Sequence, residues 1–205
     1  YRLIPKAVVR PRDVDEVGAL LRWAHQSGHG LTFRAAGTSL NGQSQSDDIL
    51  VDVREFFRRV EVLDDGKRVR TSPGAITARV NLLLSRYGRK LGPDPASSGA
   101  ATVGGVLANN ASGMTCGVKF NAYHTVDSVV IVLASGTVVD TAAPEAAAKL
   151  QRAEPALYRD LLAVKSTIGL DDELTALLRR KFSIKNTSGY HLDAFLDEER
   201  PSQIL

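Results

Sequence analysis

One stretch, Leu31–Gln43, constrains the fold more than any other part of the chain. It begins as a short apolar run fit for a buried strand and then breaks into a polar loop that contains Gly37 and Gly42. Glycine permits backbone conformations that a Cβ forbids, so such a loop can aim several N–H groups at one anion. Arg34, at the end of the run, adds a guanidinium that suits phosphate oxygens. The stretch predicts an anion-binding loop; a tight polar turn between two strands is the alternative.

A second polar stretch, Leu91–Gly117, has the same character. It reads LGPDPASSGAATVGGVLANNASGMTCG and is rich in Gly, Ser, Thr and Asn. Its centre, Thr102–Ala108, is short and apolar enough for one or two helical turns, whose N-terminus would point into the site. Two such segments rarely occur in so small a domain without a ligand to fill them. The pair therefore predicts a ligand site built from two loops.

The composition limits the class of protein. The chain has 205 residues, enough for a sizeable core as one large domain or two small lobes. Its 43% hydrophobic and 24% charged residues are ordinary for a soluble globular protein. The formal charge of +3 comes without the Lys/Arg clusters interleaved with aromatic residues that a nucleic-acid partner requires. No apolar run approaches the ~20 residues that a membrane span needs.

Cys116 is the only cysteine, which excludes internal disulfides and fits a reducing compartment, so we expect a cytoplasmic protein. A single cysteine also excludes an iron–sulfur cluster held by this segment's own thiolates, since such clusters are usually bound by four cysteine ligands. No His/Glu pair has convincing metal spacing, so no metal site is predicted. The start at Tyr1 without Met, and the stop at Leu205 just after an apparent helix, indicate a piece of a longer polypeptide.

Local patterns predict alternating strands and helices first, and hairpins and helices later. Asp13 is placed to cap a helix that Gly28 would stop, and Glu16 completes a capping box. Helices are also expected over residues 75–87 and within 144–181, and strands at Leu31–Arg34, Ile49–Val53, Val60–Leu63, Arg68–Thr71, Val126–Leu133 and Thr137–Asp140. This order indicates the α+β class with mixed sheets. We expect a first α/β lobe over residues 1–55 and a second α+β lobe over 56–205.

The two commonest phosphate-binding fingerprints are absent. A dinucleotide site of the Rossmann type needs G-x-G-x-x-G between a strand and a helix. Here the loop after Leu31–Arg34 has no such triplet and leads into another strand, and no G-x-x-x-x-G-K-[ST] occurs anywhere in the chain. A phosphate site in this chain would therefore belong to another fold.

Four linked motifs resemble one known family. Residues 34–43, RAAGTSLNGQ, resemble the first flavin loop of the FAD-binding domain shared by vanillyl-alcohol oxidase-type (PCMH-type) flavoproteins. Residues 93–97, 101–105 and 110–113 resemble its second flavin stretch, residues 126–140 the hairpin that follows, and residues 185–190 a later loop. The chain is most similar to the D-lactate, glycolate and D-2-hydroxyglutarate dehydrogenase branch. In particular, it is similar to the large bacterial members that fuse this flavoprotein to an iron–sulfur part.

The resemblance implies FAD lying between two lobes of a domain that is truncated at its C-terminus. Members that bind FAD covalently have His in the first loop, where this chain has Thr38, so noncovalent FAD is expected. Pro93 and Pro95 would form a rigid wall, because proline fixes φ. The cofactor-binding residues implied are Arg34, Ala35, Ala36, Gly37, Thr38, Ser39, Leu40, Gly42, Gln43, Pro93, Asp94, Pro95, Ala96, Ser97, Ala101, Thr102, Val103, Gly104, Gly105, Asn109, Asn110, Ala111, Ser112 and Gly113.

The resemblance also implies a reaction. This reaction is the oxidation of a D-2-hydroxy acid (lactate, glycolate or 2-hydroxyglutarate type) to the 2-oxo acid. The electrons would pass to an iron–sulfur module outside this segment or to another acceptor. Through that acceptor the protein would be able to associate with a membrane. The candidates for contact with the substrate are Lys185, Asn186, Ser188 and Tyr190. The alternative interpretation of this segment is a purely structural turn. The catalytic residues are expected beyond Leu205.

Two other readings stay open at this point. One is a non-catalytic module that binds a nucleotide or phosphate and docks a neighbour. The other is a sugar or cell-wall-precursor flavoenzyme of the same superfamily. Reduction of the flavin by D-2-hydroxy acids would separate the proposed enzyme from the docking module.

Overall fold

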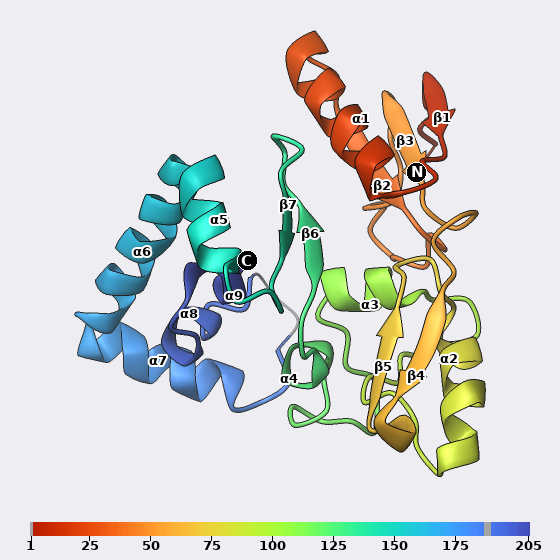
Figure 1. Cartoon of the computed structure of the whole chain (residues 1–205). Coiled ribbons are helices and arrows are strands. Elements are labelled where there is room, and N and C mark those ends of the chain that lie inside the picture. The colour runs from red at the N-terminus through yellow and green to blue at the C-terminus, as the bar shows by residue number, and fades with distance from the viewer. Residues whose placement is uncertain (1, 187–189) are drawn as a thin grey trace. The chain divides into compact units, whose positions relative to one another are not determined.

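The computed structural model describes residues 2–186 and 190–205. Contacts divide the chain into two compact units, one of Tyr1–Thr125 with Ala134–Gly136 and one of Val126–Leu133 with Thr137–Leu205. Both units combine helices with strands, as the predicted α+β class requires (Figure 1), but each sheet is either wholly parallel or wholly antiparallel and none is mixed among the described residues. The predicted lobe boundary at residues 55–56 falls inside the first unit and stays a prediction. No helix in the described part of the chain is long and apolar enough to cross a membrane.

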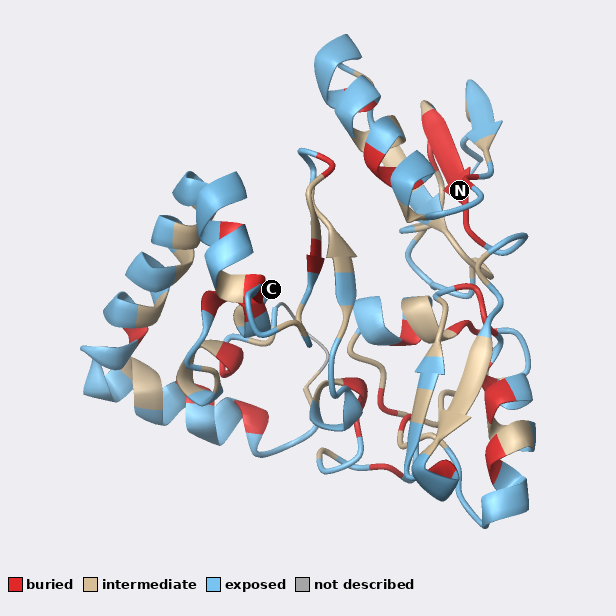
Figure 2. Ribbon diagram, in the orientation of Figure 1, coloured by how far each residue is buried: buried red, intermediate tan, exposed pale blue. Residues whose placement is uncertain are grey.

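The first unit opens with a parallel three-stranded sheet in the order β1-β3-β2, formed by β1 (Ala7–Val9), β2 (Leu31–Arg34) and β3 (Ile49–Asp52). Every residue of the central strand β3 is buried, and Figure 2 shows it next to the exposed β1. Alternate β3 side chains pack with Leu20 of the crossover helix and with Leu31. A central parallel strand is expected to be apolar, as Ile49–Val51 are, and the buried Asp52 that ends β3 is paired with Arg54 at 2.7 Å.

The crossover helix α1 (Val14–Ser27) begins and ends where the sequence predicts. The Asp13 carboxylate accepts the Glu16 N–H at 2.8 Å, and the Glu16 carboxylate accepts the Arg12 N–H at 2.8 Å. Gly28, at φ +71°, closes the helix in the left-handed conformation. Asp13 thus satisfies one donor of the first helical turn, while Glu16 accepts from the residue before the cap and not from Asp13 N–H as in the predicted capping box.

The rest of the first unit contains an antiparallel hairpin and short helices. β4 (Val60–Leu63) and β5 (Arg68–Thr71) span the two predicted strand ranges and are joined by the 3₁₀ turn η1 (Asp64–Gly66). The predicted helix over 75–87 consists of α2 (Thr77–Leu84) and the 3₁₀ turn η2 (Ser85–Tyr87). Its buried side chains pack on one face of the hairpin. Two shorter helices follow, α3 (Val103–Ala108) and α4 (Ala122–Thr125).

The second unit is a hairpin followed by helices. The hairpin strands β6 (Val130–Val132) and β7 (Val138–Asp140) are antiparallel and shorter than the predicted runs. The helices are α5 (Ala146–Ala153), α6 (Pro155–Gly169), α7 (Asp172–Phe182), α8 (Ala194–Asp197) and α9 (Pro201–Ile204). One core packs β7 against α5 and α6, and the other packs α6, α7 and α8.

Candidate cofactor site

The first predicted loop presents a run of unpartnered backbone donors. The N–H groups of Gly37, Thr38, Ser39 and Leu40 donate to no acceptor in the described part of the chain. Gly37 and Gly42 both take positive φ, +70° and +78°, which lets the chain turn without steric cost. Thr38, Ser39 and Leu40 are exposed, so their donors can reach a ligand. Successive N–H groups of this kind form an anion-binding concavity.

Arg34 stands at the base of this loop. Its carbonyl accepts the Val53 N–H at 3.1 Å, which fixes the end of β2 beside the end of β3. Its side chain packs on Gly37, where an added Cβ would lie only 2.9 Å from Arg34 Nη2. Arg34 Nε is buried and has no hydrogen-bond partner within the described residues. A buried donor without an acceptor is costly unless a ligand supplies one.

The remainder of the loop is held by its own hydrogen bonds. Gln45 N–H donates to the Gly42 carbonyl at 3.0 Å, and Asn41 N–H donates to Gln43 Oε1 at 3.1 Å. Ser46 is buried, and its hydroxyl oxygen accepts the Asp48 N–H at 2.9 Å. These bonds brace the second half of the loop while the first half keeps its donors free.

The first N–H groups of α3 have partners within the protein. The N–H groups of Val103 and Gly104 donate to the carbonyls of Ala75 and Pro73, each at 2.9 Å. These donors therefore hold the helix against the turn before α2 and are not available to a diphosphate. The Gly105 N–H, in an exposed residue, donates to no acceptor in the part of the chain that the structure describes. Any contribution of this helix end to an anion comes from Gly105.

Asp94 also has a structural task in the second stretch. Its carboxylate accepts from the hydroxyl and the N–H of Thr115, and its own N–H donates to the Ser112 carbonyl at 2.6 Å. The hydrogen bond from the Thr115 hydroxyl is the main cause of the lowered pKa of Asp94. Gly113, at φ +115°, lies so close that a Cβ there would be 2.1 Å from Asp94 Oδ1. The stretch is thus fastened to itself across the Asp94–Gly113 bridge.

Asn110 has a comparable structural role. It takes φ +40°, and its side-chain oxygen accepts the Tyr123 N–H at 2.9 Å, which joins the end of α3 to α4. Asparagine tolerates the left-handed region better than most residues. The neighbouring Asn109 is exposed, so its side chain is the freer of the two to meet a ligand.

Burial sorts the predicted cofactor residues into those that build the loops and those that can touch a ligand. The buried ones are Pro93, Ala101, Thr102 and Ser112. Those of intermediate burial are Arg34, Ala35, Ala36, Gly37, Gly42, Asp94, Pro95, Val103, Gly104, Asn110, Ala111 and Gly113. The exposed ones are Thr38, Ser39, Leu40, Gln43, Ala96, Ser97, Gly105 and Asn109.

A chain of close contacts links the end of β2 to the start of α3 within the first unit. Val53 is hydrogen-bonded to Arg34, and a Cβ added at Gly74 would lie 2.4 Å from the Val53 carbonyl oxygen. Next to Gly74, Pro73 packs on Gly104, where an added Cβ would lie 2.5 Å from Pro73 Cβ. The Pro73-Gly74 turn therefore joins the two predicted stretches, and its close packing explains the glycines at positions 74 and 104.

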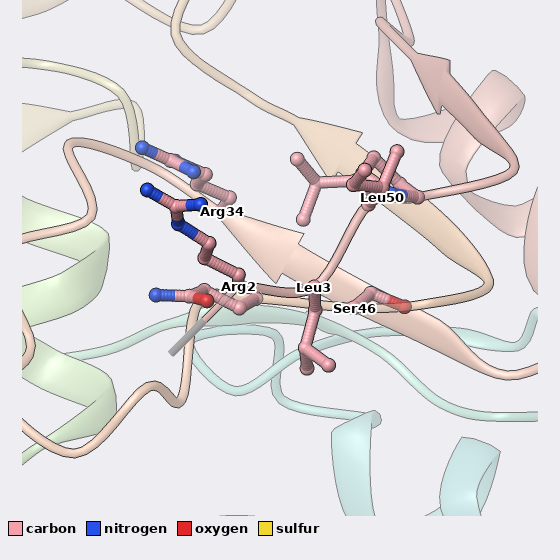
Figure 3. Close-up of a pocket in the computed structure, with 8 residues that line it drawn as sticks. Arg2, Leu3, Arg34, Ser46 and Leu50 are labelled. Atoms are coloured by element: carbon pink, nitrogen blue, oxygen red, sulfur yellow. The ribbon is translucent and has the colours of Figure 1, made fainter.

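A cavity of about 350 Å³ lies against the first stretch (Figure 3). It is lined by Arg34, Gln45 and Ser46, by Leu50 of β3 and by residues 2–5 before β1. No residue of the second stretch lines it. Sequence patterns did not single out Arg2 as a site residue, because nothing local marks a lone arginine before a strand. Only the tertiary structure places it in the same cavity as Arg34.

The substrate-side candidates lie in the second unit. Tyr190 is 90% exposed, Lys185 is exposed and Asn186 is half-buried. Ser188 lies outside the described residues. The substrate-side role of this segment stays a prediction.

Comparisons with known proteins agree on one family. The family model described as "FAD binding domain" matches residues 5–142. The D-2-hydroxyglutarate dehydrogenase of Escherichia coli (strain K12) is 34% identical over 145 residues, which are 69% of this chain and 14% of that protein. The glycolate oxidase subunit GlcD of the same strain is 30% identical over 57% of this chain and 24% of its own length. The D-lactate dehydrogenase of Archaeoglobus fulgidus is 29% identical over 65% of this chain and 30% of its own length.

Solved structures agree on the fold. The 6-hydroxy-D-nicotine oxidase of Arthrobacter nicotinovorans matches with a TM-score of 0.58 at 20% identity, over 68% of this chain and 31% of that one. A chitooligosaccharide oxidase matches with a TM-score of 0.56 at 22% identity, over 68% and 30%. In every one of these comparisons the chain spans less than a third of the matching protein.

Proposed function

Because this chain belongs to the FAD-binding domain family, whose model covers residues 5–142, we propose that it is the cofactor-binding part of a flavin-dependent dehydrogenase. The enzyme would oxidise a D-2-hydroxy acid to the 2-oxo acid, with FAD bound noncovalently. The observation that carries this proposal is the run of unpartnered N–H groups from Gly37 to Leu40 beside the buried, unpartnered Arg34 Nε.

The residues present fit the diphosphate of FAD. Gly37 leaves room above the Arg34 guanidinium, and the N–H groups of Gly37–Leu40 donate to no acceptor in the described chain. Hydrogen bonds to a charged group contribute about 1.5–3 kcal/mol each, more than bonds between neutral groups. Several such bonds from the N–H groups of Gly37–Leu40 would hold a diphosphate. Thr38 offers no imidazole for a covalent flavin link.

The bound FAD supplies the redox chemistry, while this chain supplies binding and orientation. The support for a hydroxy acid substrate is that the relatives named above are dehydrogenases or oxidases of D-2-hydroxyglutarate, glycolate and D-lactate. These compounds share a carboxylate next to a carbon that carries a hydroxyl. The solved oligosaccharide oxidase is similar in fold alone, so it gives no comparable support for a sugar substrate.

The proposal extends to the electron acceptor and the compartment. We expect electrons to leave toward an iron–sulfur module or another acceptor outside this chain, since its one cysteine cannot hold a cluster. The single cysteine also supports a reducing, cytoplasmic location. An association with a membrane would then be made through the acceptor.

The test uses the full-length polypeptide that contains this chain. We expect the purified protein to show flavin absorbance, and we expect a D-2-hydroxy acid from a panel of 2-hydroxyglutarate, lactate and glycolate to bleach it. The L-enantiomers and an oligosaccharide serve as controls. A preparation that is colourless and cannot be reconstituted with FAD would overturn the cofactor assignment. A yellow protein bleached only by the oligosaccharide would overturn the substrate class, and one that no substrate reduces would favour a docking module.

A further inference from the structure

The cavity of about 350 Å³ brings together two arginines that are far apart in the sequence. Arg34 stands at the end of β2, and Arg2 lies in the short segment before β1. In the view of Figure 3 both side chains extend in the same direction, and both line the cavity. The segment that carries Arg2 is anchored beside β3, because the Lys6 N–H donates to the Asp48 carbonyl at 2.7 Å.

Neither guanidinium has a counterion in the described part of the chain. Arg2 and Arg34 make no hydrogen bond or ion pair with a described residue, and no carboxylate is among the residues that line the cavity. Asp48, a carboxylate near this segment, is engaged elsewhere by His29 Nδ1 at 3.0 Å and by the Gly30 N–H at 2.8 Å. By contrast, Arg10 and Arg54 of the same unit both pair with Asp52. Two like charges that share one cavity repel each other unless an anion lies between them.

The other walls of the cavity suit a phosphate group. Ser46 Oγ accepts a hydrogen bond from Asp48 N–H, so its hydroxyl hydrogen remains available to donate, and Gln45 adds a side-chain amide. The apolar residues Leu3, Ile4 and Leu50 line the rest of the cavity, and of these Leu50 is buried while Leu3 and Ile4 are exposed. Guanidinium forks match phosphate oxygens in geometry as well as in charge.

We propose that Arg2 and Arg34 bind one phosphate group of the FAD diphosphate together, so that Arg2 is a cofactor-binding residue. This inference rests on the proposed function, and it adds a second guanidinium from a segment outside both flavin stretches. The free amides of Gly37–Leu40 would hold the neighbouring phosphate oxygens. Arg2 would then tie the start of the chain to the cofactor.

The experiment compares FAD and riboflavin, which lacks phosphate, on the full-length polypeptide freed of flavin. Flavin fluorescence gives both dissociation constants for the wild type, Arg2→Ala, Arg2→Lys and the control Arg12→Ala, which removes an exposed arginine outside the cavity. We expect Arg2→Ala to weaken FAD about 10-fold or more and to reduce the salt dependence of FAD binding. The riboflavin affinity of Arg2→Ala should stay unchanged. The FAD affinity of Arg2→Lys should lie between those of Arg2→Ala and the wild type, and Arg12→Ala should bind FAD as the wild type does.

The outcomes are separable. If the wild type binds FAD and Arg2→Ala binds it equally well, the inference about Arg2 is overturned while the proposed function stands. If Arg2→Ala loses FAD and riboflavin to the same degree, with a lower melting temperature of the flavin-free protein, Arg2 is structural and the inference is again overturned. If the wild type binds no FAD, the proposed function itself fails, and the inference fails with it.

Discussion

At the scale of single residues, Gly37 meets two demands that no other residue type can meet together. Its φ of +70° lies in the left-handed region, and a Cβ there would lie 2.9 Å from the Arg34 side chain. The glycine thus permits the turn and also lets the guanidinium pack beneath the loop. Both effects keep the donors of the loop in place for an anion.

Replacing Gly37 with valine should therefore weaken FAD binding. The left-handed backbone alone costs a non-glycine residue about 1–2 kcal/mol, and the side chain must also displace Arg34. We expect at least a 10-fold rise in the FAD dissociation constant, measured by flavin fluorescence on the full-length protein. The matched control is Gly169→Ala in the second unit, because a Cβ at Gly169 meets nothing within 4 Å and φ there is not positive. Equal FAD retention by Gly37→Val and the wild type would refute the assigned loop.

Replacing Arg34 with alanine tests the guanidinium itself. Loss of a hydrogen-bonded charge should raise the FAD dissociation constant about 10- to 100-fold, corresponding to about 1.5–3 kcal/mol. Arg34→Lys should recover part of the affinity, since it keeps the charge but not the planar fork. An Arg34→Ala protein that binds FAD as tightly as it binds riboflavin would show a lost phosphate contact. No change in FAD affinity would contradict the role of Arg34.

At the scale of elements, the polar loops are held by contacts that also set their pH response. Asp94 fastens the second stretch through the hydroxyl and N–H of Thr115, and the first of these bonds is the main reason why its pKa is lowered. A carboxyl with a lowered pKa in the folded state stabilises that state above its unfolded pKa. That contribution disappears as the pH falls through the folded pKa, below the ordinary value of 3.8.

Asp94→Asn should therefore destabilise the protein at pH 7 more than at pH 3. Because Asp94 is partly exposed, we expect less than about 1 kcal/mol at neutral pH. Urea unfolding of the variant and the wild type at both pH values measures the difference. If the difference in free energy of unfolding between the two proteins is the same at pH 3 as at pH 7, the charge of Asp94 is not what stabilises the loop.

The start of α1 gives a second prediction at this scale. Asp13 accepts the Glu16 N–H, so Asp13→Ala should cost about 1 kcal/mol of stability and lower the melting temperature by about 2–4 °C. Asp15→Ala is the control, because Asp15 lies in the same first turn but makes no capping bond. Similar melting temperatures for Asp13→Ala and Asp15→Ala would show that the cap contributes little.

At the scale of the whole molecule, every predicted cofactor residue belongs to the first of the two units. The second unit has its own cores, built from β7 with α5 and α6 and from α6 with α7 and α8. Cofactor binding should therefore stabilise the two units unequally. The relatives matched over this chain are several times longer, so substrate contacts from outside it are expected.

Hydrogen exchange of the full-length protein with and without FAD tests this. When the free FAD concentration is about 100 times the dissociation constant, FAD stabilises the states that bind it by about 2.7 kcal/mol. We expect FAD to slow exchange at Gly37–Leu40 and Gly105, whose N–H groups lack acceptors in the described chain, by about tenfold or more. Amides in the middle of α6 serve as the internal reference. Protection confined to the second unit would contradict the placement of the cofactor site.

The sequence by itself determined the local features of this protein. Conformational preference and side-chain pattern act over a few residues, so they predict the turn at Gly37, the helix cap at Asp13 and the apolar run of β3. The tertiary structure alone decided which partner each polar group finds. It directs the first N–H groups of α3 to Ala75 and Pro73, and Asp94 to Thr115. It also brings Arg2 into the cavity of Arg34, because a hydrogen-bond or ion partner is chosen by distance in space and not by distance along the chain.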